Sequence, residues 1–484
     1  MSLQRFWLMI TGIGAGIALL QGYGAGSQAA HPSFGTTAIR RTQPPNIILI
    51  LVDDMGIGDV SCYRHTASSL PPTPNIDRLA AEGIRFTNYY SAAPICSPSR
   101  VALTTGLVAG KWNITSFLAE RKHNRTCEQA DFLDVSAPSV ARQLKTAGYA
   151  TAHFGKWHMG GGRDVANAPG INQYGFDEYA STWESPDPDP LLTSTDWIWA
   201  KTDSIKRWNR TAYFVDKTLE FLKRNPGKPC YINLWPDDVH TPWVPDETTL
   251  ADHPKGTEKP REFRLVLAEL DKQIGRLMTG LQTLGIDQNT LVVFTSDNGA
   301  LPTFEGDRSG IYRGSKLSLY EGGIRMPFIV RYPAQTPKGL TDNKSVLCAT
   351  DLFPTFLSLA GQKPAKTGDG INAAAILLGK PNVRPVPIFW EYGRNDISFR
   401  YPAGRDRSPN LAMRQGQWKL LTNDNGSGTE LYNLAIDPSE KNDVSAQEPS
   451  LVSTMKAKLL AWRKALPATT VPATPEKPKP GRIR

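Results

Sequence analysis

Four short apolar segments recur along the chain, and each runs directly into polar residues. They span Asn46–Val52, Tyr149–Phe154, Cys230–Trp235 and Thr290–Thr295. Uninterrupted apolar runs of this length are typical of strands that are buried on both faces of a sheet. We therefore expect four buried strands, each with a polar carboxyl end.

Helical patterns separate these segments. They cover Pro74–Ala81, with Thr73 in the N-cap position, Ser136–Ala147 and Phe263–Leu284. The alternation predicts an α/β fold with a large mixed, mostly parallel sheet flanked by helices. Ligands bind outside the carboxyl ends of the strands in such sheets, so the polar residues there are the first candidates for a site.

The pattern changes after about residue 379. Shorter strand-like and helical pieces follow, at Ile388–Trp390, Trp418–Leu421, Glu430–Leu434 and Leu451–Leu466. They predict a smaller α+β subdomain over residues 380–466, after a main domain over residues 44–379. Residues 467–484 are rich in Pro, Lys and Thr, which predicts a disordered tail.

The first thirty residues have the features of an export signal. Arg5 precedes an apolar run from Phe6 to Leu20, and the small residues Ser27-Gln28-Ala29 form the expected cleavage site. The run is too short and too rich in glycine to span a membrane. We expect a signal peptide over residues 1–29, export to the periplasm or the medium, and no membrane span in the mature protein.

Composition narrows the class of protein. The 484 residues are 40% hydrophobic and 21% charged, as in a soluble globular protein. The formal net charge of +9 is spread without a dense basic run, so it does not indicate nucleic acid and is compatible with an anionic substrate.

Cysteine usage raises a specific question, because an exported chain meets an oxidising compartment. The five cysteines are Cys62, Cys96, Cys127, Cys230 and Cys348. An odd number cannot pair completely, and the absence of a C-x-x-C spacing argues against a zinc cluster or a redox pair. Cys96 lies before a predicted short helix in which Ser97 is the N-cap, Pro98 the first residue and Gly106 the end.

Oxygen ligands follow two of the strands. Asp53-Asp54 comes after the first strand, and Asp297-Asn298 comes after the last. Carboxylate and amide oxygens select Ca²⁺ or Mg²⁺ over softer metals. Each pair alone is also common in turns, so neither is specific by itself.

Cations and imidazoles follow the other strands. Lys156 and His158 come after the second strand, His240 comes after the third, and Lys316 lies further on. With a divalent cation, they suit a substrate that carries a compact oxyanion. A thiolate at Cys96, acidified by the helix N-terminus, is one candidate nucleophile, but a thiolate beside an oxygen-ligated metal is an unusual pairing.

Cys96-Ser97-Pro98-Ser99-Arg100 resembles the C-x-P-x-R signature of formylglycine-dependent sulfatases, in the alkaline phosphatase superfamily. The other clusters follow in that family's order over roughly Asn46–Gly323. The resemblance implies an alkaline phosphatase-like fold and hydrolysis of carbohydrate or aryl sulfates to alcohol and inorganic sulfate. It also implies Ca²⁺ rather than Mg²⁺, and conversion of Cys96 to formylglycine by a formylglycine-generating enzyme before the chain folds.

The resemblance further implies individual roles. The metal ligands would be Asp53, Asp54, Cys96 as formylglycine, Asp297 and Asn298. Arg100 would neutralise the charge around the nucleophile, and Lys156 and His158 would flank it, with His158 taking a proton. His240 and Lys316 would bind the sulfate, and one of them would protonate the leaving alcohol.

Several alternatives remain open from the sequence. A phosphodiester or phosphonate monoester hydrolase of the same superfamily has similar motifs, and an inactive protein that binds sulfated glycans would keep the pocket. The family's serine contact could be Ser181 or Thr182, and Arg163, in a glycine-rich stretch, is a candidate substrate contact.

Overall fold

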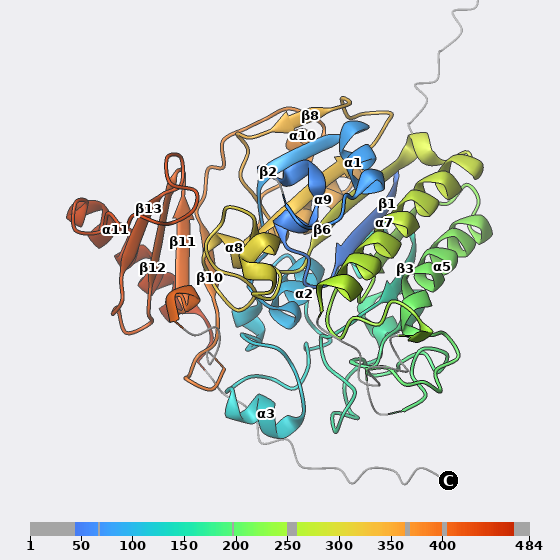
Figure 1. Ribbon diagram of the computed structural model, residues 1–484, viewed down its shortest axis with the longest axis horizontal. Coiled ribbons are helices and arrows are strands. Elements are labelled where there is room, and N and C mark those ends of the chain that lie inside the picture. The colour runs from blue at the N-terminus through green and yellow to red at the C-terminus, as the bar shows by residue number, and fades with distance from the viewer. Residues whose placement is uncertain are drawn as a thin grey trace, which may run out of the picture. The chain divides into compact units, whose positions relative to one another are not determined.

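A computed structural model describes residues 44–65, 68–195, 198–248, 259–363, 368–398 and 404–468 (Figure 1). They all belong to the unit of the chain that begins at Gln43. The predicted export signal and nearly all of the predicted tail lie outside the described residues. No helix in the described part of the chain is both long enough and apolar enough to cross a membrane.

The central element is a nine-stranded sheet with the order β4-β3-β5-β1-β6-β7-β2-β8, in which β9 also pairs with β2. Its strands are β1 (Asn46–Val52), β2 (Ile84–Tyr90), β3 (Ala150–Gly155), β4 (Glu178–Ser181), β5 (Cys230–Trp235), β6 (Thr290–Ser296), β7 (Arg325–Arg331), β8 (Leu340–Asp342) and β9 (Leu347–Cys348). Among the described strands of this sheet, only the pairs β6–β7 and β7–β2 are antiparallel. The predicted large, mixed and mostly parallel sheet is therefore confirmed.

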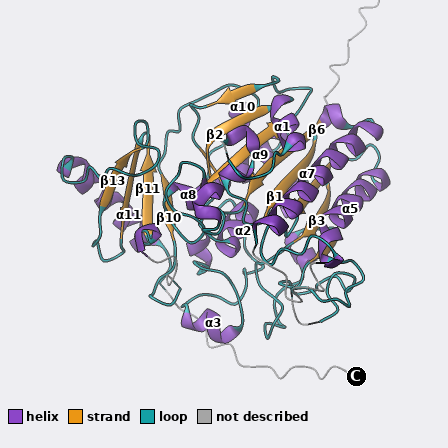
Figure 2. Cartoon of the chain, viewed as in Figure 1, coloured by secondary structure: helices purple, strands orange, loops and turns teal. Residues whose placement is uncertain are grey.

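Helices cover both faces of this sheet (Figure 2). The described α-helices of this part are α1 (Pro74–Ala81), α2 (Cys96–Thr105), α3 (Arg121–Thr126), α4 (Val140–Thr146), α5 (Arg210–Arg224), α7 (Pro260–Thr283), α8 (Glu321–Ile324), α9 (Leu352–Leu359) and α10 (Ala374–Leu377). Alternate residues of β1 point into two separate cores: Ile48 and Ile50 pack with α1, α5 and α7, whereas Ile47 and Leu49 pack with α2, α4 and α9. Burial on both faces explains why this strand is apolar from Ile47 to Val52.

The predicted helix boundaries were partly wrong. Strands β1 and β5 and helix α1 have the predicted limits, but the helix expected over Ser136–Ala147 is only Val140–Thr146. It begins later because Pro138 comes first and the Ser139 hydroxyl then caps it by accepting from the Arg142 N–H. Thr73 occupies the N-cap position of α1 without a capping hydrogen bond from its side chain.

A second sheet, of four antiparallel strands in the order β10-β11-β12-β13, lies in the C-terminal part. Its elements are β10 (Ile388–Glu391), β11 (Leu411–Gln415), β12 (Trp418–Thr422), β13 (Glu430–Asn433) and α11 (Pro449–Ala465). One face packs on α11 through Met413 and Leu459, and the other joins the main sheet through Trp390 and Tyr90. This confirms the smaller α+β part, while the boundary at residue 379 stays a prediction.

Candidate active site

The site lies at the carboxyl ends of β1 and β6. These strands pair in parallel with Val52 opposite Ser296, so the residues that follow each strand come together at one edge of the sheet. The Asp54 N–H donates to the Asp297 carboxylate at 3.2 Å, and the Asn298 side-chain amide donates to Asp54 Oδ1 at 2.8 Å. The strand-end rule therefore predicted this grouping correctly.

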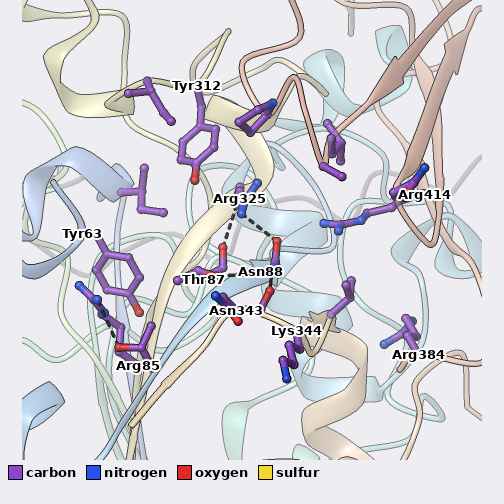
Figure 3. A pocket seen from close by; sticks show the side chains of 18 of the residues that line it. Tyr63, Arg85, Thr87, Asn88, Tyr312, Arg325, Asn343, Lys344, Arg384 and Arg414 are labelled. Atoms are coloured by element: carbon purple, nitrogen blue, oxygen red, sulfur yellow. Dashed lines mark hydrogen bonds between the residues drawn. The ribbon is translucent and has the colours of Figure 1, made fainter. Parts of the chain in front are cut away.

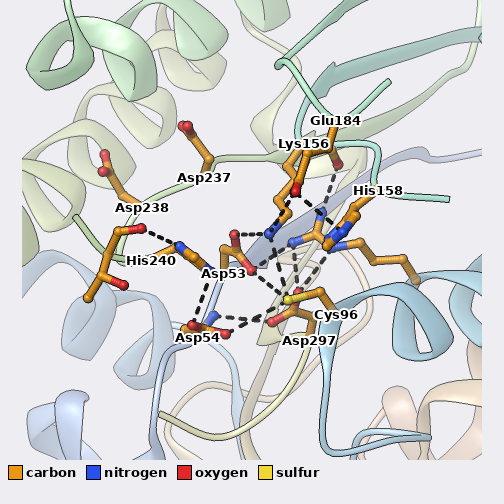
Figure 4. Close-up of polar contacts among 12 residues, drawn as sticks. Asp53, Asp54, Cys96, Lys156, His158, Glu184, Asp237, Asp238, His240 and Asp297 are labelled. Carbon is orange, nitrogen blue, oxygen red and sulfur yellow. Dashed lines mark hydrogen bonds and ion pairs between the residues drawn. The ribbon is translucent and has the colours of Figure 1, made fainter. Parts of the chain in front are cut away.

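Helix α2 presents Cys96 to these carboxylates (Figure 4). Cys96 Sγ lies 3.5 Å from Asp53 Oδ1 and 3.9 Å from Asp54 Oδ1. Ser97 does not cap the helix as predicted, because α2 already begins at Cys96 and the Ser97 hydroxyl accepts from the Leu118 N–H. Gly106 ends the helix as predicted, with a φ of 68° that favours glycine.

The electrostatic environment of Cys96 differs from the sequence-based expectation. Burial raises the pKa of its thiol well above the usual value, although Lys156 and Lys316 act in the opposite direction. The expected acidification by the helix N-terminus is therefore wrong for this thiol. A plain thiolate nucleophile is disfavoured, because an unmodified Cys96 would be protonated at neutral pH.

Arg100 and Lys156 neutralise the carboxylates from one side. Arg100 donates from Nε and Nη2 to Asp297 Oδ2 at 3.0 and 2.8 Å, and its Nη2 lies 3.3 Å from Asp53. Lys156 Nζ lies 2.7 Å from Asp53 Oδ2 and 3.7 Å from Cys96 Sγ. Arg100 is completely buried, so it can compensate charge but cannot reach a substrate.

Lys316 and His240 approach from the opposite side. Lys316 Nζ lies 2.6 Å from Asp54 Oδ2, and His240 Nε2 lies 3.5 Å from the same oxygen. Burial favours the neutral form of Lys316, but Asp54, Cys96 and Asp53 together outweigh it and raise the pKa of the ammonium. Burial lowers the pKa of His240 in spite of Asp54, so this imidazole is neutral at neutral pH.

His158 is held by Leu118 and Glu184. Its Nε2 lies 3.0 Å from the Leu118 carbonyl and 3.4 Å from the Glu184 carboxylate. Burial lowers the pKa of His158 to about 3 although Glu184 opposes this, so the ring is neutral. Because Nε2–H then donates to the carbonyl, Nδ1 is left as an acceptor, and it has no hydrogen-bond partner among the described residues.

The acidic residues fit a divalent cation. Burial alone would raise the pKa of Asp53, but Lys156, His240 and Arg100 outweigh it and hold that pKa well below its usual range. At Asp297 burial prevails over Arg100 and raises the pKa to about 7. Asn298 Oδ1 is buried without a hydrogen-bond partner in the described part of the chain. A buried free acceptor beside three carboxylates is what a hard cation requires.

A pocket of about 320 Å³ opens above this cluster. Six predicted residues line it, namely Asp53, Cys96, Lys156, His158, His240 and Lys316. The other four, Asp54, Arg100, Asp297 and Asn298, are at most 1% exposed and lie beneath. The structure thus brings all ten together in two layers, one facing a ligand and one supporting it.

The structure also shows how the remaining candidate contact residues lie relative to the pocket. Thr182 lines the pocket, whereas the Ser181 hydroxyl is engaged by Ser185 and the Asp187 carbonyl. Arg163 lines the wall as predicted, 4.5 Å above the Trp183 ring.

Further wall residues were missed from the sequence: Phe117, Glu184, Arg207 and Asp237. The strand-end rule could have found Asp237, which lies two residues after the end of β5. Glu184 and Arg207 carried no local signal, because the fold alone brings these segments to the pocket.

The fold and the site together define a class of enzyme, the hydrolases of the alkaline phosphatase-like fold. A phosphonate monoester hydrolase of Agrobacterium radiobacter shares the fold, with a TM-score of 0.61 at 20% identity over 87% of this chain and 95% of the other.

Within that class, the model of the sulfatase family matches residues 45–362, and that of the N-sulphoglucosamine sulphohydrolase C-terminal region matches residues 312–465. The chain belongs to the sulfatase family and is a sulfuric ester hydrolase.

Several similar proteins are named as carbohydrate sulfatases. An N-acetylgalactosamine-6-O-sulfatase of Bacteroides thetaiotaomicron is 28% identical over 90% of this chain and 95% of its own. The human N-acetylgalactosamine-6-sulfatase is 32% identical over 77% of this chain and 73% of its own. A solved structure from glycosaminoglycan metabolism in B. thetaiotaomicron has a TM-score of 0.71 at 28% identity, over 87% of this chain and all of the other.

Proposed function

We propose that this enzyme removes sulfate from sulfated carbohydrates, with a formylglycine derived from Cys96 and a bound calcium ion. One observation carries the proposal: Cys96 Sγ lies on the floor of the pocket, in contact with both Asp53 and Lys156. An oxygen nucleophile at this position would have carboxylates and cations on either side. That arrangement suits attack on a sulfate ester.

The side chains divide the work as follows. A formylglycine at residue 96 would supply an oxygen nucleophile that bonds to sulfur as the ester S–O bond breaks and the alcohol leaves, and a calcium ion would supply positive charge that offsets the sulfate. Asp53, Asp54, Asp297 and Asn298 would hold the ion. Arg100 favours the ionised form of Asp53 and Asp297, which it contacts, and the free Nδ1 of His158 can accept a proton.

Lys316 is the better placed proton donor for the leaving oxygen. Its ammonium stays charged because Asp54 raises its pKa. His240 is neutral, and its Nδ1 is engaged by the Thr241 carbonyl, so its Nε2 faces Asp54 as an acceptor. We therefore assign protonation of the alcohol to Lys316, and orientation of the sulfate to both residues.

The wall of the pocket supports a sugar as the leaving group. It combines the aromatic rings of Phe117 and Trp183 with the charged groups of Arg163, Glu184 and Asp237. Aromatic faces and paired polar groups suit a ring that carries hydroxyls. The names of the relatives make N-acetylgalactosamine 6-sulfate the first substrate to try.

Maturation has to come before folding. Cys96 is only 2% exposed and lies beneath the pocket walls, so a modifying enzyme could not reach it in the folded chain. We propose that a formylglycine-generating enzyme acts on the unfolded segment and that the chain is exported after or during this step, guided by residues 1–29.

Turnover of three substrates tests the function. We expect kcat/KM for N-acetylgalactosamine 6-sulfate and for an aryl sulfate to exceed that for an aryl phosphodiester. A clear preference for the diester would support the phosphodiesterase alternative instead. Tight binding of sulfated sugars without turnover, by protein with residue 96 modified, would support a non-enzymatic role.

A further inference from the structure

A second and larger cleft lies between the two sheets, with a volume of about 820 Å³. Arg85 of β2 and Lys344, which follows β8, line it from the main sheet, and Arg414 of β11 lines it from the smaller sheet (Figure 3). None of the residues lining this cleft lines the catalytic pocket. It is therefore a separate concavity.

The cleft is strongly cationic. Its arginines and lysines are Arg64, Arg85, Arg325, Lys344, Arg384 and Arg414. Among the described residues that line it, none is an aspartate or a glutamate. A concave surface of one charge sign concentrates ligands of the opposite sign.

Half of these cations are already engaged within the protein. Arg325 pairs with Glu321, Arg384 pairs with Asp351, and Arg64 donates to several backbone carbonyls. They hold the walls in place.

The other three are available to a ligand. Over the described residues, Arg85, Lys344 and Arg414 form no ion pair with a carboxylate. Arg85 donates to the Thr341 hydroxyl at 3.2 Å, and Arg414 contacts Tyr90 and the Gly416 carbonyl. Arg414 is only 7% exposed, and Glu321, which its charge helps to keep ionised, is already paired with Arg325 and Lys419. A cation buried in this way favours a bound anion.

Neutral groups complete the lining. Asn88, Asn343 and Gln417 supply amides, and the side chains of Val383 and Val386 are 78% and 44% exposed. We propose that the cleft binds a sulfated saccharide outside the catalytic pocket, with sulfates on Arg85, Lys344 and Arg414 and hydroxyls on the amides. The apolar side chains would cover the faces of the sugar rings.

Other polyanions fit this lining less well. Single-stranded nucleic acid is held by exposed aromatic faces, but the two tyrosines of the cleft, Tyr63 and Tyr312, are only 6% and 9% exposed. A membrane surface is contacted by protruding cations, whereas Arg414 lies inside a concavity. The lining therefore favours a compact ligand with separate sulfates and hydroxyls.

Direct binding tests this proposal without turnover. In a Cys96→Ala background, we expect Arg85→Gln/Lys344→Gln to weaken binding of a 6-sulfated chondroitin octasaccharide about tenfold, the loss expected for charge-assisted hydrogen bonds. The matched control is Lys223→Gln/Arg264→Gln, which removes the same two charges from exposed positions on α5 and α7. It should bind as the parent protein does.

Each other outcome would overturn the proposal. The first is that the cleft variant binds the sulfated octasaccharide as tightly as the control does. The second is that the parent protein binds the desulfated octasaccharide as tightly as the sulfated one. The third is that it binds inorganic sulfate or a polyglutamate peptide as tightly as the sulfated octasaccharide. The proposal goes beyond the proposed function and needs no catalysis. A protein that failed to hydrolyse sulfate esters could still pass this test, so the two failures are distinguishable.

Discussion

Two buried charge clusters in this protein look alike but differ in what surrounds them. One is the proposed catalytic cluster at the ends of β1 and β6. The other lies between the sheets, where Lys419 Nζ is 2.9 Å from Glu321 and 2.8 Å from Glu440. Burial raises the pKa of one carboxyl to about 7 in each, Asp297 in the first and Glu440 in the second.

The difference lies in access. Lys419 and Glu440 are 0% exposed, and they tie β12 to the segments around α8 and β13. In the catalytic cluster Lys156 and Lys316 are 4% and 8% exposed and face a pocket, and Asn298 keeps a free acceptor. A perturbed pKa therefore does not identify a functional site by itself; the group must also be accessible from a pocket.

Removing the proposed nucleophile should have the largest effect. Cys96→Ala is expected to lower kcat/KM for sulfate esters by at least ~10³-fold, because no other side chain at the floor replaces it. The matched control is Cys348→Ala, which removes another buried thiol. Steady-state kinetics of both would check this, and comparable losses would contradict the assignment.

Two lysine substitutions compare the contribution of each cluster to stability and to turnover. Lys419→Met should cost about 3–5 kcal/mol of the free energy of unfolding, because it leaves buried carboxylates unpaired. Lys316→Met should cost less stability but lower kcat by roughly 10²–10³-fold. Denaturant titration and kinetics of both variants measure the contrast. Equal loss of stability with no change in kcat would remove the distinction.

Chelation tests whether the free acceptors hold a cation. Removing calcium should lower the free energy of unfolding by roughly 3 kcal/mol relative to protein at 100-fold the dissociation constant. Asp297→Asn should abolish this dependence, whereas a carboxyl far from the site, as in Asp216→Asn on α5, should leave it unchanged. Thermal unfolding with and without calcium reports the result, and an unchanged transition in wild type would argue against the metal.

The inter-sheet cluster should give the smallest effect, seen as a dependence of stability on pH. Burial and Glu321 raise the pKa of Glu440 to about 7 despite Lys419. A raised pKa contributes stability that is full below about pH 4.5 and is lost as pH rises through 7. Between pH 5 and 8, wild type should lose about 1–3 kcal/mol that Glu440→Gln does not lose. Parallel pH profiles for the two proteins would contradict this.

The sequence predicts a part of this fold well where a single physical effect, such as burial on both faces, determines its residue pattern. Strand β1 is apolar from Ile47 to Val52 because both its faces are buried. Strand β2 mixes apolar and polar residues and β7 contains Pro327, so neither was predicted from the sequence. The grouping of Asp53, Lys156, His240 and Asp297 was predictable because parallel register gathers the ends of β1, β3, β5 and β6. Glu184 and Arg207 were not, because they reach the pocket through the tertiary fold.

The central claim concerns the chemical identity of residue 96, and mass spectrometry of the peptide that contains it tests this directly. The protein should be produced together with a formylglycine-generating enzyme and digested without reduction of aldehydes. The account predicts a peptide whose mass corresponds to formylglycine at position 96, in protein that hydrolyses sulfate esters. Active protein with an intact cysteine there would contradict it.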